Sequence, residues 1–76
     1  MRYRIEFLRE MTQEGSVCHA RAVKGVDLLL VELQAQVWSA RAREKFGAGG
    51  YLVRDLDDSG RIVSIETFNE PAPTIH

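Results

Sequence analysis

Hydrophobic and polar residues alternate strictly near the start of the chain, over residues 2–9. Tyr3, Ile5 and Phe7 are separated by charged residues. A period of two is typical of a β-strand that packs one face on a core and exposes the other face. Residues 12–16 are polar and contain a glycine, which suits the connection between two strands. The pattern therefore predicts a strand followed by a turn.

Residues 17–23 fit two structures. Cys18, Ala20 and Ala22 alternate with polar residues, which favours a second strand with these three small side chains under a helix. In a helix, the same residues would continue across Gly25 into the next element, and an interior glycine costs about 1 kcal/mol relative to alanine. We favour the strand and keep the helix as the alternative.

Residues 26–46 are predicted to form one long helix. Leu, Glu, Gln, Ala, Arg and Lys dominate this segment, and it contains no glycine or proline. Gly25 suits the N-cap, and Asp27 places a negative charge in the first turn. Gly47 suits the stop at the C-terminal end.

Two further strands are predicted after the helix, over residues 51–54 and 62–68. The residues 57–60 between them read Asp-Asp-Ser-Gly, which fits a type I turn with a left-handed glycine. The predicted fold class is therefore α+β, an antiparallel β-sheet with one long helix packed on one face. The element order is β-β-α-β-β, or β-α-β-β if residues 17–23 are helical.

Two apolar stripes run along the predicted helix, nearly opposite each other. At about 100° per residue, the first stripe contains Val26, Leu29, Leu30, Leu33, Val37 and Ala40. The second stripe contains Leu28, Val31, Ala35, Trp38, Ala42 and Phe46. A helix on a single sheet needs one stripe, so we expect the first stripe to face the sheet and the second to need a partner. The second stripe is thus the predicted interface of a homodimer; the alternatives are cover by residues 69–76 or by a sheet wrapped around the helix.

Composition narrows the class of protein. The chain has 76 residues, with 10 Lys and Arg against 11 Asp and Glu and a formal net charge of −1. So short a chain makes one domain, assigned to residues 1–68, and residues 69–76, with two prolines, are predicted to be an irregular tail. The single cysteine excludes an internal disulfide. The longest apolar run, residues 28–31, is far shorter than the about 20 residues of a membrane span, and the first residues do not resemble a signal peptide. We expect a soluble, cytoplasmic protein of bacterial type.

Residues 55–66 resemble an EF-hand calcium loop. Oxygen-bearing side chains occupy alternate positions, a glycine follows at the sharp turn, and Glu66 is the twelfth residue. An EF-hand needs a helix on each side, whereas both flanks here are predicted to be strands. We therefore interpret the segment as an acidic hairpin turn. Calcium binding is the least favoured of the candidate functions.

Other chemical motifs are weak. Cys18 and His19 are adjacent, so on a strand they point to opposite faces and cannot bind one ion together. The glycine-rich residues 47–50 follow a helix, whereas a phosphate-binding loop precedes one. The serines have no base at an interpretable spacing. We predict no catalytic residues, no metal site and no cofactor, and expect a protein that is not an enzyme.

Nucleic-acid binding is the alternative function. If Val63 and Ile65 face the helix, then Arg4, Arg21 and Arg54, together with Phe68, face away from it. An arginine-bearing open sheet face can hold single-stranded nucleic acid through stacking and phosphate contacts. Acidic residues share this face, which is typical of an ordinary solvated sheet, and the near-neutral net charge argues against a dedicated nucleic-acid binder.

The function that we predict is a non-catalytic, homo-oligomeric protein-interaction module. The homodimer forms through the central helix, and an unidentified protein partner could take the place of the second copy. The nucleic-acid module built on Arg4, Arg21 and Arg54 follows as the alternative, and the calcium loop at residues 55–66 comes last.

Overall fold

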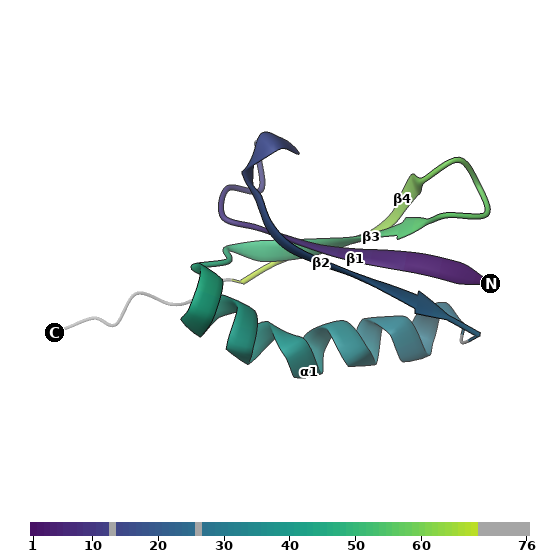
Figure 1. The fold of residues 1–76 in the computed structure, drawn as a ribbon, viewed down its shortest axis with the longest axis horizontal. Coiled ribbons are helices and arrows are strands. Elements are labelled where there is room, and N and C mark those ends of the chain that lie inside the picture. The colour runs from purple at the N-terminus through teal and green to yellow at the C-terminus, as the bar shows by residue number, and fades with distance from the viewer. Residues whose placement is uncertain (13, 26, 69–76) are drawn as a thin grey trace, which may run out of the picture.

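The protein folds as a twisted sheet with one long helix beneath it, as Figure 1 shows for the computed structural model. The structure describes residues 1–12, 14–25 and 27–68. The elements are β1 (Arg2–Leu8), a short 3-10 helix (Glu14–Ser16), β2 (Val17–Lys24), α1 (Leu28–Phe46), β3 (Gly50–Asp55) and β4 (Arg61–Thr67). The order β-β-α-β-β confirms the predicted α+β class, and residues 17–23 are a strand. The predicted tail, residues 69–76, lies outside the described residues.

The sheet has the strand order β2-β1-β3-β4, and all three neighbouring pairs are antiparallel. β1 is therefore a central strand, and the alternation that marked it in the sequence places Tyr3, Ile5 and Phe7 on the face above α1. Tyr51 and Val53 from β3 complete the sheet side of the core. Both hairpins curve away from the helix (Figure 1).

The helix begins two residues later than predicted. Asp27, not Gly25, is the N-cap, and its carboxylate accepts a hydrogen bond from the backbone N–H of Leu30 at 3.1 Å. This contact satisfies one of the unpaired amides of the first turn, which glycine cannot do through a side chain. The C-terminal stop is as predicted, because Gly47 adopts a left-handed φ of 69°.

The orientation of β2 is opposite to the predicted one. Directly paired residues of antiparallel strands share a face, and His19, Arg21 and Val23 pair with the helix-facing residues of β1. Ala20 and Ala22 therefore lie on the other face and are exposed. Pairing shifts between Phe7 and Leu8, which leaves Cys18 as an extra residue, partly buried, with its thiol donating to the Phe7 carbonyl at 3.4 Å.

The end of β4 also differs from the prediction. Ile65 pairs with Leu52 on the face away from the helix and is 60% exposed. Phe68 instead packs on the core, with its ring 6.1 Å from the ring of Tyr51. A register shift between Val53 and Arg54 changes the alternation of faces along the strand pair. A period-two pattern cannot show such a shift.

Candidate functional site

The predicted dimer stripe is the face of α1 that packs on the sheet. Val31 and Ala35 are fully buried within one chain, and Ala42 is nearly so. Leu28, Trp38 and Phe46 are partly buried against the same core. The assignment of the two stripes was therefore wrong. We call these six residues the inner stripe: Leu28, Val31, Ala35, Trp38, Ala42 and Phe46.

The opposite stripe is exposed. Leu29 is 68%, Leu30 50%, Leu33 50% and Val37 71% exposed, and these four residues are called the outer stripe below. Val26, which was predicted to belong to it, lies outside the described residues. Large apolar side chains gathered on one helix face are typical of an interaction surface.

An apolar hollow lies between the outer stripe and the edge strand β2. It has a volume of about 280 Å³ and is lined by Val23, Leu30, Leu33, Gln34 and Val37. The lining residues of α1 are three or four positions apart, so they share one helix face. The outer stripe is thus a grooved apolar surface rather than a set of separate side chains.

A second, smaller hollow follows along the same side, between β2 and the C-terminal half of α1. It has a volume of about 90 Å³. We call it the basic pocket, because its lining combines cationic and aromatic side chains: His19, Arg21, Trp38, Arg41, Ala42 and Phe46. Sequence analysis missed this site because it assigned His19 and Arg21 to the wrong face of β2.

Ring contacts hold the side chains of the basic pocket in place. The Arg21 guanidinium lies 4.4 Å from the centroid of the Trp38 ring, a cation–π contact. The imidazole of His19 stacks on Phe46, with the centroids 4.7 Å apart and the planes at 10°. The ring of Phe7 lies on His19 as well, at 6.2 Å.

The three arginines of the predicted nucleic-acid surface do not lie together. Arg21 is on the helix side of the sheet, in the basic pocket. Arg4 and Arg54 are on the other face, where both form ion pairs with Glu6, at 3.4 and 3.2 Å. Glu6 is only 8% exposed, so its carboxylate lies between the two guanidinium groups and offsets their charge. Arg54 also donates to the Gly60 carbonyl at 3.0 Å.

The acidic segment 55–66 forms a hairpin whose carboxylates bind within the chain. Asp57 accepts hydrogen bonds from the backbone and side chain of Arg2, at 2.9 and 3.0 Å. These bonds lower the pKa of the Asp57 carboxyl. Asp58 pairs with Arg61 at 2.6 Å. Glu66 lies along β4 opposite Tyr51. Among residues 1–12, 14–25 and 27–68, no three potential ligands gather closely enough to hold a metal ion.

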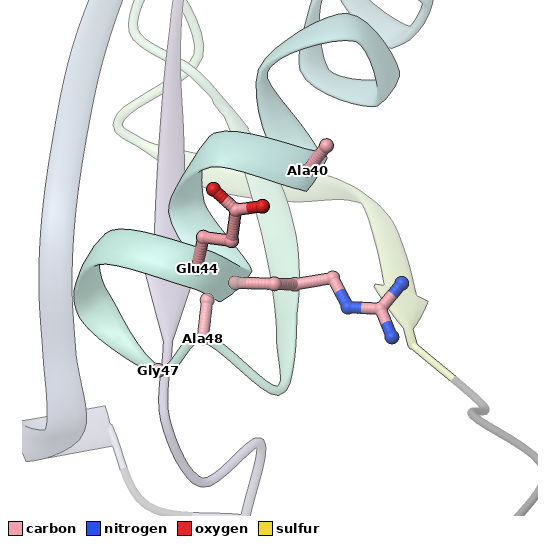
Figure 2. Close-up of a pocket in the computed structure, with 5 residues that line it drawn as sticks. Ala40, Glu44, Gly47 and Ala48 are labelled. Atoms are coloured by element: carbon pink, nitrogen blue, oxygen red, sulfur yellow. The ribbon is translucent and has the colours of Figure 1, made fainter. Parts of the chain in front are cut away.

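A broad depression of about 520 Å³ lies at the C-terminal end of α1. Figure 2 shows Ala40, Glu44, Gly47 and Ala48 around it. Arg43 also lines it and lies 5.3 Å from the Phe68 ring centroid. Arg43 and Glu44 are its charged residues and the other three lining residues are small, so this open depression offers few groups for recognising a ligand.

Comparison with known proteins assigns no relative. No protein-family model matches the chain, and no curated protein or solved structure matches it significantly. In the described part of the chain, no helix has the length and apolar character to cross a membrane.

Proposed function

We propose that this protein is a non-catalytic interaction module that forms a homodimer through the outer stripe of α1. The observation that carries the proposal is the exposure of Leu29, Leu30, Leu33 and Val37, all at least half exposed on one helix face. Burying such a side chain contributes on the order of 1 kcal/mol. A two-fold dimer would bury eight of them, which offsets several kcal/mol of the cost of association.

The charges of α1 favour a second copy as the occupant. The acidic residues Asp27 and Glu32 lie at its beginning, and residues 41–46 at its end hold three basic residues against one acidic residue, Glu44. A two-fold axis across the helix places the two copies antiparallel. The acidic half of one helix then lies beside the basic half of the other, which supports this orientation. The helix has 19 residues and spans about 28 Å, long enough for the whole stripe to take part.

Solution mass tests the proposal. Size-exclusion chromatography with light scattering, over a range of protein concentrations, should give twice 8.6 kDa for the natural chain. The double variant Leu33→Gln/Val37→Gln should be a monomer with an unchanged circular dichroism spectrum, because glutamine is a good helix former.

The matched control is Ile65→Gln. This residue is 60% exposed but lies on the opposite face of the sheet, so the variant should remain a dimer. A natural chain that is monomeric at every concentration would refute a second copy as the occupant and leave the stripe to another protein. A double variant that stays dimeric would show that the interface lies elsewhere.

A further inference from the structure

We propose that the basic pocket binds an oxyanion, the phosphate or carboxylate group of a small ligand. Two arginines line it, Arg21 from β2 and Arg41 from α1. No acidic residue lines it. The ion pairs formed among the described residues involve Arg2, Arg4, Arg54 and Arg61. Neither arginine of the basic pocket takes part in one of these ion pairs, whereas Arg4 and Arg54 both pair with Glu6.

Ring contacts hold two side chains of the basic pocket, Arg21 and His19, in position before any ligand arrives. Arg21 lies over the Trp38 ring at 4.4 Å. His19 stacks on the rings of Phe46 and Phe7. A side chain that is already ordered loses less conformational entropy on binding. The aromatic contacts thus favour binding without occupying the hydrogen-bonding edges of these donors.

The size of the basic pocket selects the ligand group. Ala42 lies between Trp38 and Phe46 on the same helix face, at spacings of four residues, and its small side chain leaves the hollow between the two rings. The volume of about 90 Å³ corresponds to about three water molecules, which suits an oxyanion group rather than a whole nucleotide. Guanidinium groups bind carboxylate and phosphate oxygens through paired, charge-assisted hydrogen bonds.

The test is a titration followed by ¹H–¹⁵N NMR. The chain has one tryptophan, so the indole N–H of Trp38 gives a single signal inside the basic pocket. Inorganic phosphate and acetate are titrated separately, with ionic strength held constant by chloride. We expect saturable shifts of the Trp38 indole signal and of the Ala42 and His19 amides. Saturation by phosphate alone assigns a phosphoryl ligand, and saturation by both anions extends the site to carboxylates.

Two charge-matched variants distinguish anion binding in the basic pocket from non-specific attraction of the anion to positive charge. Arg21→Gln/Arg41→Gln removes both guanidinium groups, and Lys24→Gln/Lys45→Gln removes two charges from the same two elements outside the basic pocket. Each charge-assisted hydrogen bond contributes about 1.5–3 kcal/mol, so the arginine variant should bind at least about tenfold more weakly. The lysine variant should bind as the natural chain does.

The outcomes are distinct. Shifts that do not saturate, or that are equal in both double variants, would overturn the site. If the arginine variant loses its native spectrum, Arg41→Gln alone takes its place, because Arg41 is exposed and has no packing contact of the kind that Arg21 makes with Trp38. All six lining residues belong to one chain, so the Leu33→Gln/Val37→Gln variant should still show saturable binding. The oxyanion site is thereby tested independently of the dimer.

Discussion

The two apolar faces of α1 differ in the size of their central residues, not in how hydrophobic they are. The inner stripe has Val31, Ala35 and Ala42 along its centre line, all buried, and the larger, partly buried residues Leu28, Trp38 and Phe46 along its two edges. The outer stripe has leucines and a valine throughout. Small side chains let the helix backbone approach a twisted sheet closely enough for dense packing, whereas a row of leucines would hold it away. The small residues along its centre therefore favour the inner stripe as the face that packs on the sheet.

The largest effect should come from placing a charge on each face in turn. Val31 is 0% and Val37 71% exposed, so Val31→Asp and Val37→Asp are the same substitution in the two environments. A buried charge without a partner costs about 3–5 kcal/mol, a large share of the stability of a domain this small. Circular dichroism and urea unfolding should show Val31→Asp largely unfolded and Val37→Asp folded, and light scattering should show that Val37→Asp is a monomer. A folded Val31→Asp would mean that α1 can turn its other face to the sheet.

Enlarging an alanine on each face of α1 should again affect the buried face more than the exposed one, with a smaller loss of stability than a buried charge causes. Ala35 is fully buried against the sheet, and Ala40 is exposed. Replacing a buried alanine by leucine in a packed core costs about 1–3 kcal/mol, so Ala35→Leu should lower the free energy of unfolding by that amount. Ala40→Leu should change it by about 0.5 kcal/mol or less. Equal losses in urea titrations of the two variants would remove volume as the reason for the choice of face.

The N-cap should affect both faces together, because it sets where α1 begins. Asp27→Ala removes the acceptor of the Leu30 amide and should cost about 1 kcal/mol. Asp27→Ser, which keeps an acceptor, should restore most of it. Thermal unfolding measures both variants. A neutral Asp27→Ala would show that packing of the inner stripe alone defines the helix start.

The smallest effect concerns Tyr51, a ring on the helix-facing side of the sheet. Burial raises its pKa, and a hydrogen bond with Gln36 of α1 partly opposes the rise. Because the folded-state pKa exceeds the unfolded value of about 10, the contribution of the neutral hydroxyl is complete below about pH 10 and is lost as the pH rises through the folded value. Between pH 8 and 11, Tyr51→Phe should lose less stability than the natural chain in urea titrations. An equal loss of stability in Tyr51→Phe and in the natural chain would show that other residues cause the loss at alkaline pH.

Local patterns predicted most of the fold. The alternation around Ile5 marked a central strand, the helix formers before Gly47 marked α1 and its stop, and the residues 57–60 marked the last hairpin. Each of these signals acts over a few neighbouring residues, so it is readable without the rest of the chain.

The errors lie where two elements meet. The register shift between Val53 and Arg54 turned Ile65 outward, and the pairing of β2 with β1 turned His19 and Arg21 toward α1. Neither the register shift nor the pairing of β2 can be predicted from the local pattern, since a strand that alternates small and polar residues can turn either face toward the helix. The basic pocket was missed for this reason.

The sequence by itself determined the number and order of the elements, the two apolar stripes of α1 and the glycine that ends it, because backbone propensity and periodicity are local properties. Only the tertiary structure decided which stripe is buried, which face of β2 meets the helix and which arginines carry an ion pair. These outcomes depend on side-chain volume and strand register between residues far apart in the chain. All of them are fixed together when the sheet packs on the helix.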